Sequence, residues 1–158
     1  MSIKALTTMI KGIIFDFNRT LYDKDNNQFF PEAKPLLREL KGVYKLSLVC
    51  KAVDTVDVIY KDYEFISFFE KIIIKPEKTE KEFQECLAAM KLSAAEAIIV
   101  GDKIKGEVSI GNKMGIITVW FRQGKYAQEL PSSPREKPTF IITALPQLPI
   151  LLYELKTR

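Results

Sequence analysis

Apolar residues in this chain are concentrated in short continuous runs, and the segments between the runs are polar with helical spacing. A strand buried on both faces of a parallel sheet appears as a continuous apolar run, whereas a half-exposed strand alternates. We therefore expect a sheet of five to six buried strands. The runs lie at about 11–17, 43–50, 72–74, 97–101 and 116–121, with a shorter one within 137–143.

Helix signals occur between these runs. Residues 31–41 begin at a proline and end before a glycine, and their leucines share one face. Thr79 and Glu82 have the pattern of a capping box, which predicts a helix that continues through Met90. Further helices are expected at about 105–114 and at 149–156. Within 53–69, the apolar residues from Val56 to Tyr63 have helical spacing, and residues 65–69 are left without an assignment.

This alternation of strands and helices predicts an α/β fold with a three-layer, Rossmann-like architecture. In such a fold, helices cover both faces of a doubly wound, mostly parallel sheet. A chain of 158 residues is long enough for one hydrophobic core, so we expect a single domain over residues 1–158.

Composition narrows the class of protein. The formal net charge is +4, but lysines and glutamates are interspersed, which predicts a solvated surface and no nucleic-acid partner. The apolar runs are too short to span a bilayer, and residues 1–12 lack the apolar region of a signal peptide, so we expect no membrane partner. The two cysteines give no disulfide framework, which favours a cytoplasmic protein. Because the chain has no histidine, any general acid or base must be Asp, Glu, Lys, Tyr or Cys.

Candidate chemistry lies at the ends of two predicted strands. Asp16 follows the first apolar run, and Asp102 follows the fourth, directly after Gly101. The carboxyl ends of parallel strands form the ligand-binding edge of an open α/β sheet, so the two carboxylates could meet there. Mg²⁺ is commonly bound by one or two carboxylates together with substrate phosphates. The alternative is that each aspartate only caps the turn after its strand.

Two segments resemble the first and last motifs of the haloacid dehalogenase (HAD) superfamily of phosphotransferases and hydrolases. They are residues 11–21, KGIIFDFNRTL, and residues 97–116, AIIVGDKIKGEVSIGNKMGI. The first motif is an apolar strand followed by Asp-x-Asp-x-Thr. The last is an apolar strand, Gly-Asp, a later acid, and Gly-x-x-x-Gly. Both stand in the family's order, and the resemblance covers about residues 10–150.

The resemblance implies a Mg²⁺-dependent phosphomonoester hydrolase that acts on a phosphorylated substrate. Asp16 matches the nucleophile, which forms an aspartyl-phosphate and also binds the metal. Asp102 matches the second metal-binding acid, and Thr20 matches a structural threonine. The family also places a lysine near the start of the fourth helix. Lys78 and Lys75 are both candidates for it, and we favour Lys78 because it directly precedes the capping threonine.

Three positions depart from the family pattern. Asn18 replaces the aspartate that acts as general acid and base, and such a group typically contributes about 10²–10⁴ in rate. Asn18 could still bind the metal through its backbone carbonyl. Cys50 stands where Thr or Ser binds phosphate, and it is either a weak donor there or an inert core residue. Glu107 stands where Asp is common, and it either reaches the metal through water or solvates the helix start.

These departures leave two functions open. The first is a phosphatase weakened at Asn18, which would act best on substrates with good leaving groups. The alternative is a catalytically degenerate HAD-fold protein that binds or regulates. We favour the enzyme because Asp16, Asp102 and a nearby lysine are retained.

The HAD family often inserts a cap domain between these motifs, but the intervals here are too short for one. Residues 21–30 could form only a small flap. Its aromatic residues either close over the site or pack onto the core. Capless members often use a partner subunit as a lid, so a homodimer is one option.

Overall fold

The computed structural model describes residues 9–51 and 55–157. Its elements alternate along the chain as the sequence predicts. The strands are β1 (Gly12–Phe15), β2 (Tyr22–Asp23), β3 (Gln28–Phe29), β4 (Lys45–Lys51), β5 (Lys71–Lys75), β6 (Ala97–Gly101), β7 (Ile117–Phe121) and β8 (Phe140–Ile142). The helices are α2 (Ala33–Lys41), α3 (Val56–Lys61), α4 (Tyr63–Ser67), α5 (Glu80–Met90), α6 (Ser109–Met114) and α7 (Gln147–Lys156). The short helical segments are η1 (Ala94–Glu96), η2 (Ile104–Val108), η3 (Gly124–Tyr126) and η4 (Pro134–Glu136).

Six strands form one sheet in the order β5-β4-β1-β6-β7-β8, and every neighbouring pair in it is parallel. The first strand of this sheet, β1, is a central one, and β4 and β5 follow on one side of it. The chain then crosses over to form β6, β7 and β8 on the other side of β1. The order therefore reverses between β1 and β6, which is where ligands bind in open α/β sheets. The predicted doubly wound α/β fold is confirmed.

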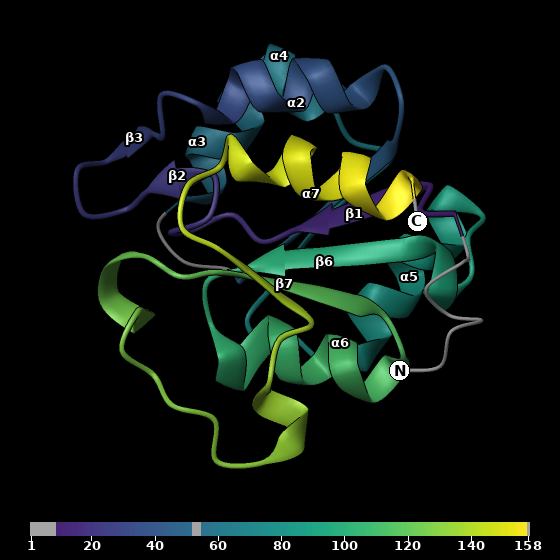
Figure 1. Ribbon diagram of the computed structural model, residues 1–158. Coiled ribbons are helices and arrows are strands. Elements are labelled where there is room, and N and C mark those ends of the chain that lie inside the picture. Colours follow the sequence, from purple (N-terminus) through teal and green to yellow (C-terminus); the bar gives the residue numbers. More distant parts are fainter. Residues whose placement is uncertain (1–8, 52–54, 158) are drawn as a thin grey trace.

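Helices cover both faces of the sheet. Figure 1 shows α2, α4 and α7 on one side of the strands and α5 and α6 on the other. The side chains of β1 alternate between the two layers. Ile13 and Phe15 join the cluster that contains the leucines of α2 and α7, while Ile14 joins the cluster that contains Phe83 and Met90 of α5. Because both faces are packed, the strands are continuous apolar runs.

Two expected helices take different forms. The helical spacing between Val56 and Tyr63 is divided between α3 and α4, because the Asp62 side chain accepts a hydrogen bond from the Phe65 N–H and begins a second helix. This second helix includes residues 65–67, which the sequence left without an assignment. The helix expected at about 105–114 begins instead as the π-helical segment η2, with Gly106 outside helical geometry. Within residues 9–51 and 55–157, none of the helices qualifies as a membrane span. The prediction about a signal peptide falls largely on residues 1–8, which lie outside the described residues.

Between β1 and α2, a stretch described without a gap, the chain forms only the β2–β3 hairpin and no inserted cap domain. The hairpin's aromatic rings face the core. Tyr22 stacks on Phe17 with 5.1 Å between ring centroids, and Phe29 meets Phe17 edge-on at 5.9 Å. Phe30 meets Phe121 edge-on at 6.0 Å. These rings therefore fasten the hairpin to the domain instead of forming a lid.

Candidate active site

Two acidic residues lie together at the carboxyl edge of the sheet. β1 and β6 are parallel neighbours, and Asp16 and Asp102 are the first residues after these strands. The Asp16 N–H donates to the Val100 carbonyl at 2.9 Å, which fixes the path of the loop after β1. The Trp120 indole N–H donates to the Asp102 carbonyl at 2.9 Å and fixes the second loop. The topology thus joins two residues that are far apart in the sequence.

Glu107 is the third carboxyl of this cluster. One carboxylate oxygen from each of Asp16, Asp102 and Glu107 lies within 4.8 Å of the other two. Glu107 is only 4% exposed, so the suggestion that it solvates a helix start is wrong. The reason is the π-helical turn of η2, which places Glu107 against the sheet edge. Gly101 leaves room for it, because a Cβ at position 101 would lie 2.7 Å from Glu107 Oε2.

Lys78 bridges two of these carboxyls. Its Nζ donates to Asp16 Oδ1 at 2.5 Å and to Glu107 Oε1 at 2.8 Å, and its side chain is only 10% exposed. The capping box begins α5 directly after Lys78, as the sequence predicts: the Thr79 N–H donates to the Glu82 carboxylate at 3.1 Å. Lys75 ends β5 and is exposed. The structure therefore brings Lys78, and not Lys75, to the acidic cluster.

The close packing of these charges shifts their pKa values. Burial, reinforced by the charges of Asp16 and Glu107, raises the pKa of Asp102 to about 9. Burial and the neighbouring Asp16 also raise the pKa of Glu107. Burial disfavours the charged form of Lys78, but Asp16 and Glu107 outweigh it and raise the Lys78 pKa. The cluster contains three carboxyl groups but only one ammonium group, so its carboxylates are not fully neutralised by Lys78.

The other residues of the first motif lie in the loop after β1. The Thr20 hydroxyl donates to Asp16 Oδ2 at 3.2 Å, so both oxygens of Asp16 are held by hydrogen bonds. Asn18 lines the pocket at the sheet edge. Its Nδ2 donates to Thr55 Oγ1 at 3.4 Å, while its Oδ1 is buried and has no hydrogen-bond partner among the described residues.

Cys50 lies near the site but in the core. Its thiol donates to the Lys51 carbonyl at 3.3 Å, and its side chain packs in the cluster shared with α2 and α7. Burial, with a smaller effect of Asp16, raises the pKa of Cys50 to about 11, so the thiol stays neutral near pH 7. Cys50 is absent from the described residues that line the pocket. This placement favours the core alternative over phosphate binding.

A pocket of about 670 Å³ lies over the acidic cluster at the carboxyl edge. Its floor contains the three carboxyls and Lys78, and its rim is strongly basic. The rim carries Arg19, Lys24, Lys51, Lys103, Lys105 and Lys125, together with Tyr126. The net charge of +4 is compatible with a basic rim that attracts an anionic substrate, but the sequence did not identify the residues that form it. Arg19 and Lys103 each stand close behind a motif aspartate, and residues 124–133, which include Tyr126, resemble the tail of family members, yet neither signal places these side chains at the site.

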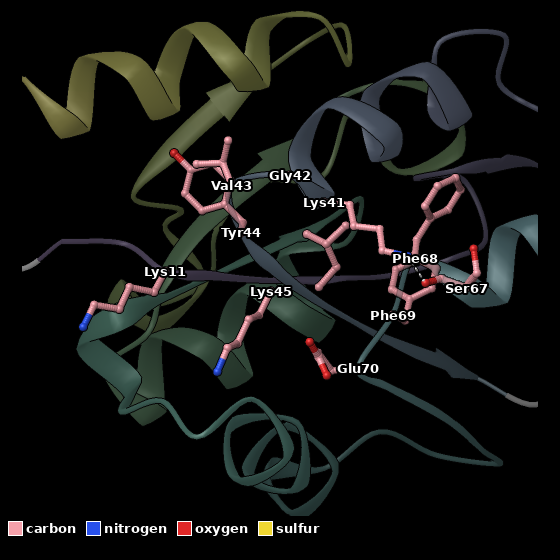
Figure 2. A pocket seen from close by; sticks show the side chains of 11 residues that line it. Lys11, Lys41, Gly42, Val43, Tyr44, Lys45, Ser67, Phe68, Phe69 and Glu70 are labelled. Carbon is pink, nitrogen blue, oxygen red and sulfur yellow. Dashed lines mark hydrogen bonds between the residues drawn. The ribbon is translucent and has the colours of Figure 1, made fainter.

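A second pocket, of about 490 Å³, lies at the opposite edge of the sheet. It is shown in Figure 2 and is lined by residues that precede or begin β1, β4 and β5, such as Lys11, Lys45 and Glu70. The ammonium of Lys41 is engaged there, donating to the Ser67 carbonyl at 2.5 Å. Glu70 is the one acidic residue among the described residues that line this pocket. Among those residues there is therefore no cluster of acids like that formed by Asp16, Asp102 and Glu107.

Comparison with known proteins agrees with this geometry. Residues 75–148 match the model of the HAD-hydrolase-like family. The glyceraldehyde 3-phosphate phosphatase of Pyrococcus furiosus is 37% identical over 90 residues, which is 54% of this chain and 37% of that protein. The corresponding phosphatase of Methanopyrus kandleri is 27% identical over 125 residues, which is 72% of this chain and 52% of that protein.

The fold also matches solved structures. A HAD-hydrolase from Bacillus subtilis, bound to magnesium, superposes with a TM-score of 0.76 at 15% identity, covering 92% of this chain and 99% of that one. At that identity the likeness concerns the fold alone. The alignments to the two archaeal phosphatases span 37% and 52% of those proteins, so at most about half of either is matched.

Proposed function

Because the chain belongs to the haloacid dehalogenase superfamily, we propose that its acidic cluster is the active site of a Mg²⁺-dependent phosphomonoester hydrolase. One observation carries the proposal: three buried carboxyls and the Lys78 ammonium meet at the switch point of the sheet, beneath an open pocket. The names of the relatives support a phosphatase activity on a small phosphorylated molecule such as glyceraldehyde 3-phosphate.

The donor set suits a divalent cation. Asp102 Oδ2 and Glu107 Oε2 are buried and have no hydrogen-bond partner among the described residues. Buried acceptors without donors are costly, and Mg²⁺ prefers carboxylate oxygens. Asp16, Asp102 and Glu107 would hold the ion, directly or through water, and Asn18 would add its backbone carbonyl. When bound, the ion would supply positive charge to the phosphoryl oxygens.

The protein's own residues then have distinct tasks. Asp16 attacks phosphorus, the ester P–O bond breaks, and an aspartyl-phosphate forms; water later cleaves it to release phosphate. Thr20 fixes the orientation of the Asp16 carboxylate through its hydrogen bond. Lys78 neutralises negative charge on Asp16 and on the transferred group from a water-poor position, where such stabilisation is strongest.

Asn18 limits this chemistry. The departing alkoxide needs a proton, and an amide cannot donate one as a carboxylic acid does. The aryloxide of an aryl phosphate and the carboxylate of an acyl phosphate depart with little need for a proton. Aryl and acyl phosphates should therefore be the better substrates. The same residue favours a second candidate function: a HAD-fold protein that keeps the cation site and a phosphorylated ligand but has lost turnover.

The proposed function is tested by comparing the parent with Asn18→Asp on p-nitrophenyl phosphate and on an alkyl phosphate, with Mg²⁺ and with a chelator. We expect Mg²⁺-dependent phosphate release by the parent on the aryl ester. The Asn18→Asp variant should raise turnover of the alkyl ester by about tenfold or more, because it restores a general acid.

Two results would argue against this assignment. If the parent releases no phosphate but binds Mg²⁺ in a calorimeter, the degenerate binding protein is the better description. If Asn18→Asp improves both esters equally, the residue acts on something other than leaving-group protonation.

A further inference from the structure

The basic rim of the pocket has an organised centre at Tyr126. Three cations lie over or beside its ring: the Arg19 guanidinium carbon is 5.9 Å from the ring centroid, Lys103 Nζ 4.7 Å and Lys125 Nζ 5.4 Å. They come from the loops after β1, β6 and β7, which are neighbouring strands. The group therefore spans the same sheet edge as the acidic cluster and lines the same pocket. We call Arg19, Lys103, Lys125 and Tyr126 the tyrosine-centred cation group.

The chain holds this group in place. The Gln123 side-chain amide donates to the Arg19 carbonyl at 2.6 Å and joins the loop after β7 to the loop after β1. Arg19 itself has φ +61°, a left-handed conformation that is uncommon for a residue with a side chain. Such strain persists only where the surrounding structure enforces it, and it is concentrated at functional sites.

The positive charges of the group are poorly balanced by acids. Arg19 pairs with Asp25 at 3.3 Å, and Asp25 is itself 65% exposed. Neither Lys103 nor Lys125 forms an ion pair with a carboxylate of the described residues. Arg19 Nε is also buried with no hydrogen-bond partner among the described residues. Three neighbouring basic side chains, one of which has a buried N–H without an acceptor among the described residues, form the arrangement expected at an anion-binding site.

We propose that the tyrosine-centred cation group binds a second anionic group of the substrate, so that the preferred substrates are small phosphate esters that also carry a carboxylate or a second phosphate. The inference rests on the proposed function, since it assigns the scissile phosphate to the acidic cluster. The volume of about 670 Å³ suits a small molecule that reaches both parts of the pocket.

The test uses two matched pairs of substrates with alkyl leaving groups. The first pair is 3-phosphoglycerate and glycerol 3-phosphate, which differ in a carboxylate. The second is 1,3-propanediol bisphosphate and 3-hydroxypropyl phosphate, which differ in a phosphate. We expect kcat/KM to be at least about tenfold higher for one or both doubly anionic members, mainly through KM. The pair with the larger ratio identifies the second anion.

Lys103→Met keeps the aliphatic stem over the ring and removes the charge. It should reduce the preference by about tenfold, and Lys125→Met should act in the same direction. Lys71→Met is the matched control, because Lys71 is exposed at the opposite edge, at the start of β5. Equal kcat/KM within both pairs, or equal effects of Lys103→Met and Lys71→Met, would overturn the inference while turnover itself upholds the proposed function.

If these alkyl esters are not hydrolysed, as the lack of a general acid at Asn18 allows, the anion site is still tested; the proposed function fails only if p-nitrophenyl phosphate is left intact as well. Calorimetry at fixed free Mg²⁺ would then compare the two members of each pair. Binding of a doubly anionic member that is about tenfold tighter than binding of its partner, with the difference lost in Lys103→Met, supports the site. Equal binding within both pairs overturns it.

Discussion

Replacing Asp16 with asparagine is expected to lower turnover of p-nitrophenyl phosphate by about 10⁴-fold or more, because the nucleophile is removed and no other group can form the covalent intermediate. The change preserves the size of the side chain, and the amide oxygen of the variant can still accept a hydrogen bond from Thr20 or Lys78, so the fold should persist. Phosphate release under saturating Mg²⁺ measures the loss, and a thermal melt checks the fold.

Asp57→Asn is the matched control for this variant. Asp57 is exposed on α3, so the same chemical change there should leave turnover within experimental error of the parent. If Asp16→Asn retained a tenth of the parental rate, hydrolysis would have to proceed without this carboxylate as nucleophile. The proposed mechanism would then be wrong even if the phosphatase activity were real.

Replacing Lys78 with methionine should have two large effects. Turnover should fall by about 10²–10³, the usual cost of removing a preorganised group that stabilises transition-state charge. Without bound metal, the unfolding free energy should also fall by about 3–5 kcal/mol, because the variant leaves buried carboxyls without their ammonium partner. Urea denaturation in chelator and steady-state assays in Mg²⁺ measure the two effects separately.

Lys75→Met provides a close control in sequence. Lys75 is exposed at the end of β5, so the substitution should leave stability within about 0.5 kcal/mol and turnover unchanged. Added Mg²⁺ should recover part of the stability lost in Lys78→Met, since a cation would replace the missing positive charge. Equal behaviour of the two variants would contradict the role given to Lys78.

Much of the fold follows from the sequence because its signals are local and strong. The continuous apolar runs mark strands with two buried faces, and the capping box at Thr79 fixes the start of α5 and hence the position of Lys78. The meeting of Asp16 and Asp102 also follows, because residues after neighbouring parallel strands share one edge.

Other parts of the site depend on long-range packing and could not be predicted. The inward position of Glu107 results from a π-helical turn and from the space left by Gly101, and neither has a simple sequence signature. The group around Tyr126 is assembled from three loops by contacts such as the Gln123–Arg19 hydrogen bond, between residues 104 positions apart. Nothing in the neighbouring sequence indicates such a contact.

A crystal structure of the protein with Mg²⁺ and fluoroberyllate, a mimic of the phosphoryl group, would show whether Asp16 is the nucleophile beside the cation. We expect beryllium bonded to a carboxylate oxygen of Asp16, Mg²⁺ held between Asp16 and Asp102, and Lys78 in contact with the fluorides. Mg²⁺ bound away from these carboxyls, or fluoroberyllate attached to a different residue, would refute the proposed active site.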